Sequence, residues 1–353
     1  MSPRAEPPLT AGAVMRAKPI AVNGHTMGAD SLLRYLEIKV HHLIREQPWD
    51  SIRVVGAHDR QAVVSRHEKT GKLFNVQRPT ASIHGRDLTL MAFPGTDYVH
   101  HYALIIATYL AMTGRSADTV TYQLPDPAQC CAVIQQLDLD LDGDLVIVGW
   151  GLSQLAPCDG AWNQARGYAW KRARVHGRAV LYLGFLHSIW GDVAGRVVWR
   201  LAELGARDVV YVGKVGSLTP EVEPNTMLAT GSESLLDGSL VQWDDFFGDL
   251  AAARPGVRSG VHVTSPSILL EDRDWLTKHA DYAFVDPEIG PMGAAANRAG
   301  IRFGYLHVIS NNLARCYPAD LSNERHRDVI RRRAVLVGRI RDTIADRLAT
   351  RTT

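Results

Sequence analysis

The chain has 353 residues, and its 39 lysine and arginine residues nearly balance its 37 aspartate and glutamate residues, giving a formal net charge of +2 at pH 7. Hydrophobic residues make up 46% of the chain and charged residues 22%, as in an ordinary globular protein. This composition argues against wholesale disorder, collagen-like repeats and a strongly basic nucleic-acid-binding protein. The length allows one large domain or two ordinary ones.

The sequence predicts a cytoplasmic protein without membrane contact. Its longest apolar run, residues 102–112, is shorter than the roughly 20 residues that span a bilayer. The opening MSPRAEPPLTAGA lacks a signal-peptide core and predicts a flexible leader over about the first 20 residues. Four cysteines without a CxxC spacing favour reduced thiols and no metal site.

The first 140 residues alternate helix-like and strand-like segments. Apolar spacing predicts helices over 31–46, 99–113 and 128–137, and strands over 52–56, 88–93 and 119–124. Such alternation favours an α/β fold whose sheet is mostly parallel.

The segment LDLDLDGD, residues 137–144, is interpreted as a domain boundary. Its aspartates resemble a calcium-binding loop, but Gly149 occupies the twelfth position, where such a loop needs a bidentate glutamate. A turn before a buried strand is the better interpretation. We therefore predict an N-terminal α/β domain of unknown role over residues 1–140 and a second domain over residues 141–353.

The second domain alternates more regularly. Its predicted strands are 145–149, 179–184, 209–213, 261–263, 282–285 and 304–309, and its predicted helices are 189–204 and 323–348. The last helix has an arginine-rich outer face. Since the chain is nearly neutral, a solvated or subunit-contacting face is favoured over a nucleic-acid-binding one.

Glycine-bearing or polar bends follow five of these strands, where parallel α/β sheets bind ligands. They are GWGLS (149–153), GFLHS (184–188), GKVGS (213–217), VDPE (285–288) and SNN (310–312). His187 could equally be a structural histidine, and Asn311 and Asn312 could simply shape a loop. Lys214 lies near two glycines and suits an anion. Glu288, after an apolar strand, suits the capture of vicinal hydroxyls.

The ordered series VIVGWG, VLYLGFLHSIWG, ELGARDVVYVGKVGSL, SPSILLED, FVDPEIGPMGAAANRAGI and YLHVISNNL resembles the nucleoside phosphorylase/nucleosidase superfamily, over about residues 144–350. This resemblance implies a central mixed, mostly parallel sheet flanked by helices, to which residues 1–140 add a further α/β domain. It also implies cleavage of an N-glycosidic bond and a homo-oligomer. A rival alignment would start the fold at residues 52–56.

The resemblance assigns roles to two motifs. The family glutamate that holds the ribose 2′- and 3′-hydroxyls corresponds to Glu288, with Pro287 replacing the methionine that packs on the sugar and base. The family aspartate that protonates the leaving base corresponds to Asn311, after Ser310. An amide can bind a base edge but cannot deliver a proton as a carboxylic acid does. Asparagine does serve at the comparable place in trimeric 6-oxopurine phosphorylases.

The expected phosphate site departs further from the family pattern. The first bend, with Gly149 and Gly151, carries no arginine, and Tyr211 stands where hexameric phosphorylases have another. Between Gly213 and Gly216, Lys214 replaces the phosphate-binding serine or threonine. Either Lys214 binds the anion or water replaces phosphate as the nucleophile.

The resemblance thus implies a nucleoside or nucleotide substrate, with phosphate as a second substrate in a phosphorylase. Glu288 would hold the sugar, and Asn311, with Asn312, would stabilise the departing base. His187 or Lys214 would contact the 5′ group or the anion. Two alternatives stay open: a non-catalytic protein that binds a nucleoside-like ligand, and a biosynthetic enzyme acting on an unusual ribosylated intermediate. No cofactor motif is present, and we predict no cofactor, metal, nucleic acid or membrane partner.

Overall fold

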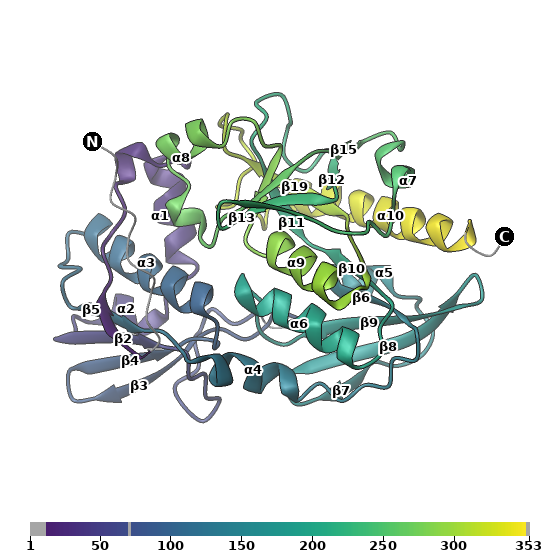
Figure 1. The fold of residues 1–353 in the computed structure, drawn as a ribbon. Helices are drawn as coiled ribbons and strands as arrows, with labels where there is room; N and C mark the ends of the chain where they lie inside the picture. The colour runs from purple at the N-terminus through teal and green to yellow at the C-terminus, as the bar shows by residue number, and fades with distance from the viewer. Residues whose placement is uncertain (1–11, 70–71, 351–353) are drawn as a thin grey trace.

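The structure is a computed structural model that describes residues 12–69 and 72–350. Within these residues the strands form three sheets, and helices pack against them (Figure 1). The predicted α/β class is confirmed: a central, mostly parallel sheet is flanked by helices, and a separate sheet is built from the N-terminal part of the chain.

The N-terminal sheet has the strand order β1-β5-β2-β4-β3. Its strands are β1 (Val14–Arg16), β2 (Ser51–Val55), β3 (Thr80–His84), β4 (Asp87–Met91) and β5 (Val120–Gln123), and its helices are α1 (Ala29–Glu37), α2 (His42–Glu46) and α3 (Thr96–Met112). The leader predicted over the first 20 residues lies partly outside the described residues. For the described part, the prediction of a flexible leader is wrong, because β1 pairs with β5 at the edge of the sheet.

The helix predicted over residues 31–46 is two helices. The chain leaves helical geometry at His41, whose Nδ1 accepts a hydrogen bond from the backbone N–H of Leu43 at 3.3 Å and so caps α2. Apolar spacing continues through the break because both helices bury residues in the same core. Periodicity alone therefore could not reveal it.

The central sheet has the order β18-β10-β6-β9-β8-β7, and the first four of these strands are parallel. Its strands are β6 (Leu145–Gly149), β7 (Asn163–Ala165), β8 (Tyr168–Val175), β9 (Arg178–Phe185), β10 (Asp208–Val212) and β18 (Arg302–Tyr305). Helices α4 (Pro127–Gln135), α5 (Leu152–Leu155), α6 (Asp192–Glu203) and α9 (Ile289–Ala299) belong to this part.

The third sheet has the order β14-β13-β16-β17-β11-β19-β12-β15. Its strands are β11 (Lys214–Ser217), β12 (Leu228–Thr230), β13 (Glu233–Leu236), β14 (Ser239–Gln242), β15 (Val257–Ser259), β16 (His262–Thr264), β17 (Phe284–Asp286) and β19 (His307–Asn312). The remaining helices are α7 (Asp249–Ala252), α8 (Arg273–Lys278), α10 (Arg327–Ala349) and the 3-10 turns Val22–Gly24 and Ile268–Leu270. Strands β10 and β11 are separated by Gly213 alone, so one segment joins both sheets.

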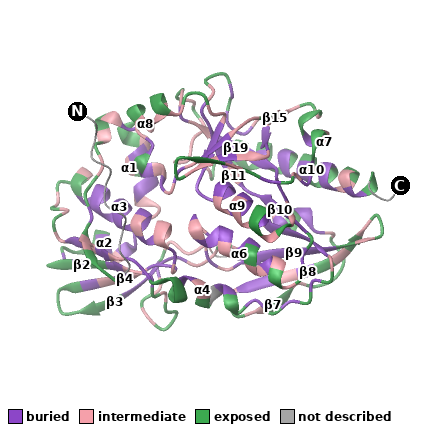
Figure 2. Ribbon diagram, viewed as in Figure 1, coloured by how far each residue is buried: buried purple, intermediate pink, exposed green. Residues whose placement is uncertain are grey.

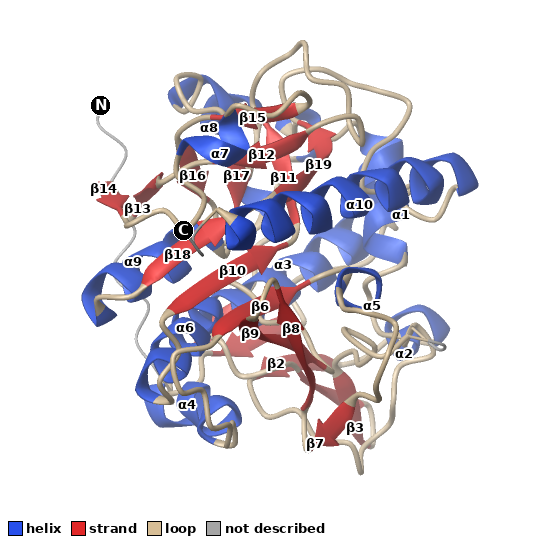
Figure 3. Cartoon of the chain, turned by 90° about the vertical axis from the view of Figure 1, so that its right-hand side faces the viewer, coloured by secondary structure: helices blue, strands red, loops and turns tan. Residues whose placement is uncertain are grey.

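Alternation along β10 separates the two faces of the central sheet. Val209 and Tyr211 pack in the core that includes α6 and α9, whereas Val210 and Val212 pack in the core that includes α10. Figure 3 shows α10 along one face of β10 and β18. Figure 2 shows the buried residues concentrated between these layers. The alternation decides which side chains can meet at the strand ends.

The hydrophobic core of the N-terminal part is largely separate from the cores of the other two sheets. Leu269 is the buried residue that the second half of the chain contributes to it. The domain boundary at residues 140/141 stays a prediction. None of the helices in residues 12–69 and 72–350 has the length and apolar character needed to cross a bilayer.

Candidate functional site

The predicted bends at the carboxyl ends of β6, β9 and β10 lie side by side. Val148 of β6 is in register with Leu183 of β9 and with Tyr211 of β10. Gly149 adopts φ = +121°, and a Cβ there would lie 2.1 Å from the carbonyl oxygen of Val212. Glycine at 149 thus lets the first bend press against the β10 backbone. Gly151, at φ = +74°, begins α5 near α10.

The bend after β10 is built on a histidine that the sequence analysis did not single out. The Gly213 N–H donates to Nδ1 of His307 at 3.2 Å, and a Cβ at Gly213 would lie 2.8 Å from Nε2 of the same ring. The neutral imidazole that accepts at Nδ1 carries its proton on Nε2. His307 itself is fully buried at the start of β19.

Asp286 positions Glu288 at the beginning of α9. Oδ1 of Asp286 accepts hydrogen bonds from the backbone N–H groups of Glu288 at 2.9 Å and Ile289 at 2.8 Å. These bonds satisfy donors that the first helical turn leaves without partners. Pro287 and Glu288 are both buried as a result. The Asp-Pro-Glu sequence therefore fixes the glutamate inside the protein.

Two histidines flank Asp286. Nε2 of His262 accepts a hydrogen bond from the backbone N–H of Asp286 at 2.8 Å and lies 3.1 Å from Oδ1, and Nε2 of His307 lies 3.6 Å from Oδ2. Burial opposes ionisation of Asp286, but the two histidines and the helix N–H groups outweigh it and lower the pKa of this carboxyl. Nδ1 of His262 in turn contacts the Ser234 hydroxyl at 2.8 Å. This polar network joins β13, β16, β17 and β19 behind Glu288.

Glu288 has the opposite electrostatic setting. Burial, followed by the charges of Asp286 and Asp97, raises the pKa of the Glu288 carboxyl well above its usual value. The Tyr211 hydroxyl is hydrogen-bonded to the carboxyl. The raised pKa favours the neutral carboxyl, which has an O–H donor as well as an acceptor oxygen. Two neighbouring carboxyl groups with opposite pKa shifts are typical of acid–base sites.

Asp97, on α3 of the N-terminal part, is a further carboxyl that the sequence analysis missed. Its Oδ2 accepts from the Asp192 N–H at 2.9 Å, and Oδ1 of Asp192 accepts from the Asp97 N–H at 3.3 Å. The two helix starts, α3 and α6, thus cap each other. Burial and then the nearby Asp192 raise the pKa of Asp97 to about 7.

Asp97→Asn should raise the free energy of unfolding at pH 8 by about 2 kcal/mol and leave it nearly unchanged at pH 4. The native state keeps the Asp97 proton up to a pKa of about 7, whereas the ordinary aspartate pKa is 3.8. Stability from the protonated form is therefore complete below pH 3.8 and is lost as pH rises toward 7. Asparagine keeps the acceptor oxygen without the charge.

Urea denaturation of the wild type and this variant at both pH values measures the difference. The exposed Asp281→Asn serves as the control. An Asp97→Asn protein that is less stable than the wild type at pH 8 would contradict the assignment.

His187 lies in the bend after β9, under aromatic rings from the N-terminal part. Its ring stacks on Phe93 with centroids 4.8 Å apart, and Phe93 also contacts His58 at 4.5 Å. The His187 Nδ1–H donates to the Ser188 carbonyl at 3.0 Å, so Nε2 carries a lone pair. Nε2 is buried without a hydrogen-bond partner among the described residues. Burial lowers the pKa of His187, which keeps the ring neutral.

The two asparagines of the Ser310–Asn312 segment differ in how fully their side-chain amides are hydrogen-bonded. Asn312 donates to the carbonyls of Thr219 at 2.8 Å and Val222 at 2.9 Å, and its Oδ1 accepts two backbone N–H groups. Its expected contact with a base would require breaking this loop. Asn311 accepts from the Ser310 hydroxyl at 3.2 Å, and its Nδ2 has no hydrogen-bond partner among the described residues.

Asn311 meets the glycine turn, whereas Lys214 points elsewhere. A Cβ at Gly216 would lie 2.7 Å from Cδ1 of Leu313 and 3.2 Å from Nδ2 of Asn311, which together account for glycine at that position. Lys214 forms an ion pair with Glu324, which also pairs with Arg333 of α10 at 3.1 Å. Tyr211 and His307 therefore connect Glu288 to Gly213. Lys214 is not part of this connection, because its partner is Glu324.

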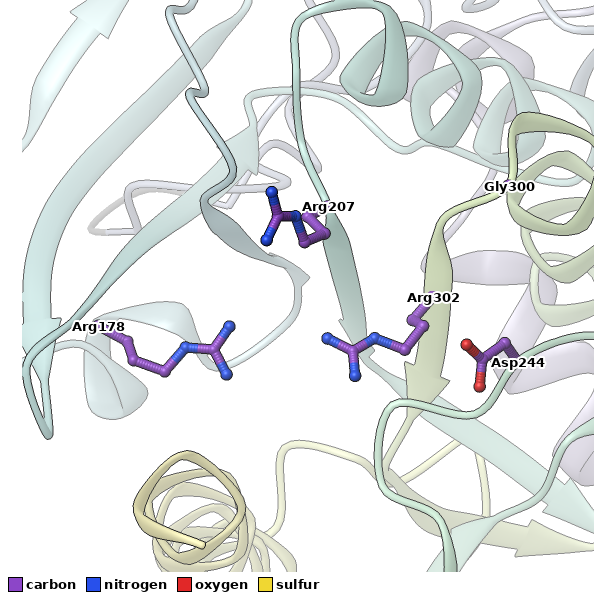
Figure 4. Close-up of a pocket in the computed structure, with 5 residues that line it drawn as sticks. All are labelled: Arg178, Arg207, Asp244, Gly300 and Arg302. Carbon is purple, nitrogen blue, oxygen red and sulfur yellow. The ribbon is translucent and has the colours of Figure 1, made fainter. Parts of the chain in front are cut away.

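An open polar hollow of about 530 Å³ lies elsewhere, at the amino ends of the central strands (Figure 4). It is lined by Arg178, Arg207, Asp244, Gly300 and Arg302. The buried Asp208 accepts from Nε of Arg302 at 2.6 Å and lies 3.5 Å from Arg178. Because β10 runs from Asp208 to Val212, this hollow lies at the opposite end of the central strands from Glu288. Arg178 and Arg302 therefore compensate the buried charge of Asp208.

The described residues contain no group of three or more histidine, cysteine, aspartate or glutamate side chains arranged to hold a metal ion.

Comparisons with known proteins give distant similarities. No protein-family model matches the sequence. The chain is 27% identical over 233 residues to oxidoreductase cns1 of Cordyceps militaris, an alignment that covers 59% of this chain and 29% of that protein. The chain thus spans less than a third of the length of this curated relative.

Solved structures with a similar fold include nucleosidases and phosphorylases. The methylthioadenosine/S-adenosylhomocysteine nucleosidase of Campylobacter jejuni has a TM-score of 0.45 at 11% identity, covering 57% of this chain and 98% of that one. Uridine phosphorylase of Vibrio fischeri has a TM-score of 0.47 at 13% identity, covering 64% and 96%. The futalosine hydrolase of Helicobacter pylori has a TM-score of 0.42 at 14% identity, covering 58% and 96%.

These nucleosidases and phosphorylases belong to the superfamily that the sequence motifs resemble. At TM-scores below 0.5 they assign no activity to this chain.

Proposed function

We propose that this chain cleaves or exchanges the N-glycosidic bond of a nucleoside or nucleotide through an oxocarbenium-like transition state. The observation that carries the proposal is Glu288, a buried carboxyl fixed at the start of α9 by Asp286 and hydrogen-bonded to Tyr211. A buried carboxyl can bind both hydroxyls of a vicinal diol, because its neutral form both donates and accepts.

The reaction places positive charge on the sugar and negative charge on the departing base. Glu288 orients the sugar, and the ionised Asp286 behind it favours positive charge developing nearby. Asn311 offers its amide to the edge of the base. The buried Nε2 of His187 is an acceptor for a hydroxyl or for an attacking water.

The nucleophile is water in a hydrolase and phosphate in a phosphorylase. Glu221 is exposed, Glu223 pairs with Arg332 at the surface, and Glu233 accepts from Gln242 at 2.7 Å. These three glutamates are therefore poor candidates for a catalytic base. The replacement of the family aspartate by Asn311 favours the non-catalytic alternative, a protein that binds a nucleoside-like ligand. The homo-oligomer stays a prediction.

Incubation with a panel of nucleosides and nucleotides, with and without phosphate, followed by chromatography, tests the proposal. We expect free base to be released. Release only with phosphate identifies a phosphorylase, and release without it identifies a hydrolase. Binding without turnover across the panel would contradict the catalytic proposal and support the ligand-binding alternative.

A further inference from the structure

The segment that follows β16, SPSILLED (265–272), is held by side chains of the N-terminal part of the chain. Leu269 is buried in the N-terminal core. Nε2 of His25 is hydrogen-bonded to the carbonyl oxygen of Ile268 at 2.9 Å. A loop from the second half of the chain is therefore fixed on the first half.

A fully buried contact joins this segment to α3. Nδ1 of His101 lies 2.7 Å from the hydroxyl oxygen of Ser267, and the two residues are only 2% and 1% exposed. The His101 ring stacks on Trp190 with centroids 4.4 Å apart, and the Trp190 Nε1–H donates to the Pro266 carbonyl at 2.8 Å. Burial lowers the pKa of His101 to about 3, so its ring is neutral. Loss of either partner would leave the other polar group buried without its hydrogen bond.

From Ser267 a short series of hydrogen bonds reaches Glu288. The Ser265 hydroxyl donates to the Ser267 carbonyl at 3.1 Å. The Ser265 N–H donates to the Asp286 carbonyl at 3.0 Å, which extends the pairing of β16 with β17 beyond the last residue of β16. Oδ1 of Asp286 accepts from the Glu288 N–H at 2.9 Å. Every residue of this series is buried.

The same helix also holds the other side of the candidate site. Asp97 lies one helical turn before His101, and Asp97 and Asp192 each accept a hydrogen bond from the other's backbone N–H. Asp192 begins α6, a few residues after His187. Helix α3 thus contacts both of the chain segments that place His187 and Glu288.

We infer that His101 is a positioning residue, which fixes the backbone that carries Glu288 by way of this series of hydrogen bonds. The role of Glu288 in binding the ligand rests on the proposed function. A buried network that is hydrogen-bonded at both ends resists displacement, and a small displacement of a binding group is enough to slow a reaction. The N-terminal part thereby acquires a role in the chemistry of the second half of the chain.

Hydrogen exchange of the full chain without any ligand tests this inference independently of activity. His101→Phe keeps a ring that can stack on Trp190 but removes Nδ1. We expect the backbone N–H groups of Glu288 and Ile289, which Asp286 protects, to exchange at least about tenfold faster in this variant than in the wild type.

His41→Phe is the matched control. His41 is also fully buried in the N-terminal part, and its hydrogen bonds to Leu43 and Val63 stay within that part. The control should speed exchange in the N-terminal part and leave residues 288 and 289 unchanged. Unchanged exchange at these two residues in His101→Phe, or equal acceleration in the control, would overturn the inference.

Two further variants test the path itself. Ser267→Ala removes the hydroxyl that His101 contacts, so combining it with His101→Phe should speed exchange at residues 288 and 289 no more than the stronger single variant does. Multiplying effects would show that the two residues act separately and would contradict the path. His101→Asn, whose amide can take the place of Nδ1, should restore exchange to within about threefold of the wild type.

Kinetics on a substrate found in the nucleoside panel separates this role from the proposed reaction. We expect His101→Phe to lower kcat/KM about tenfold, His101→Asn to restore most of the loss, and His41→Phe to keep the wild-type value. Cleavage that His101→Phe leaves at the wild-type rate would overturn the positioning role and leave glycosidic cleavage standing. Faster exchange at residues 288 and 289 without cleavage of any compound in the panel would support the positioning role and remove the proposed reaction.

Discussion

Glu288→Ala should lower kcat/KM for glycosidic cleavage by about 100-fold or more, equivalent to about 3 kcal/mol of transition-state stabilisation. Alanine removes both the donor and the acceptor that the buried carboxyl offers to the sugar hydroxyls. It also leaves the Tyr211 hydroxyl without the carboxyl to which it is hydrogen-bonded. The loss should appear in KM as well as in kcat, because the contact orients the sugar before and during bond cleavage.

Glu288→Gln gives a graded comparison. An amide has the shape of the neutral carboxyl and also carries a donor and an acceptor, but it cannot ionise. We expect an intermediate loss of about tenfold. The exposed Glu221→Gln is the matched control and should keep wild-type kinetics. Steady-state kinetics on a substrate found in the panel measures all three variants, and a Glu288→Ala protein with wild-type kcat/KM would exclude a role for this residue in the reaction.

The sequence predicted those parts of the fold that depend on local patterns. The buried strand Leu145–Gly149 was predicted with its observed bounds, because it consists of four apolar residues followed by a glycine. The strand predicted over 304–309 is instead β18 and β19, and the final helix begins at Arg327 rather than 323. Strand β8 was missed, since its charged residues obscure the alternation of a strand with one exposed face.

The candidate site was only partly accessible from sequence. Glu288 followed from its motif, and its burial agrees with a binding role. The partners that set its chemistry come from distant positions: Asp97 is nearly two hundred residues away and reaches the site only through packing of α3 against α6. No periodicity reports such contacts. His307 did carry a signal, since a histidine inside an apolar strand needs a polar partner.

Asp286 is expected to have the largest effect on stability. Asp286→Ala should lower the free energy of unfolding by about 4 kcal/mol. The substitution removes two hydrogen bonds to the start of α9 and the carboxylate between His262 and His307. It also removes the carboxylate oxygen that lies 3.6 Å from the buried Nε2 of His307. Guanidinium denaturation followed by tryptophan fluorescence measures the change.

Asp286→Asn separates the two contributions to this stability. Its Oδ1 can still cap α9, but its amide nitrogen would face the Nε2–H of His307, donor against donor. We therefore expect a smaller loss of about 2 kcal/mol. The exposed Asp328→Ala, whose pair with Arg331 lies at the surface, should change stability by less than about 0.5 kcal/mol. An Asp286→Asn protein as stable as the wild type would contradict this expectation. The charge of Asp286 would then contribute nothing to its contacts with the two histidines, and the polar network behind Glu288 would be stabilised by the helix cap alone.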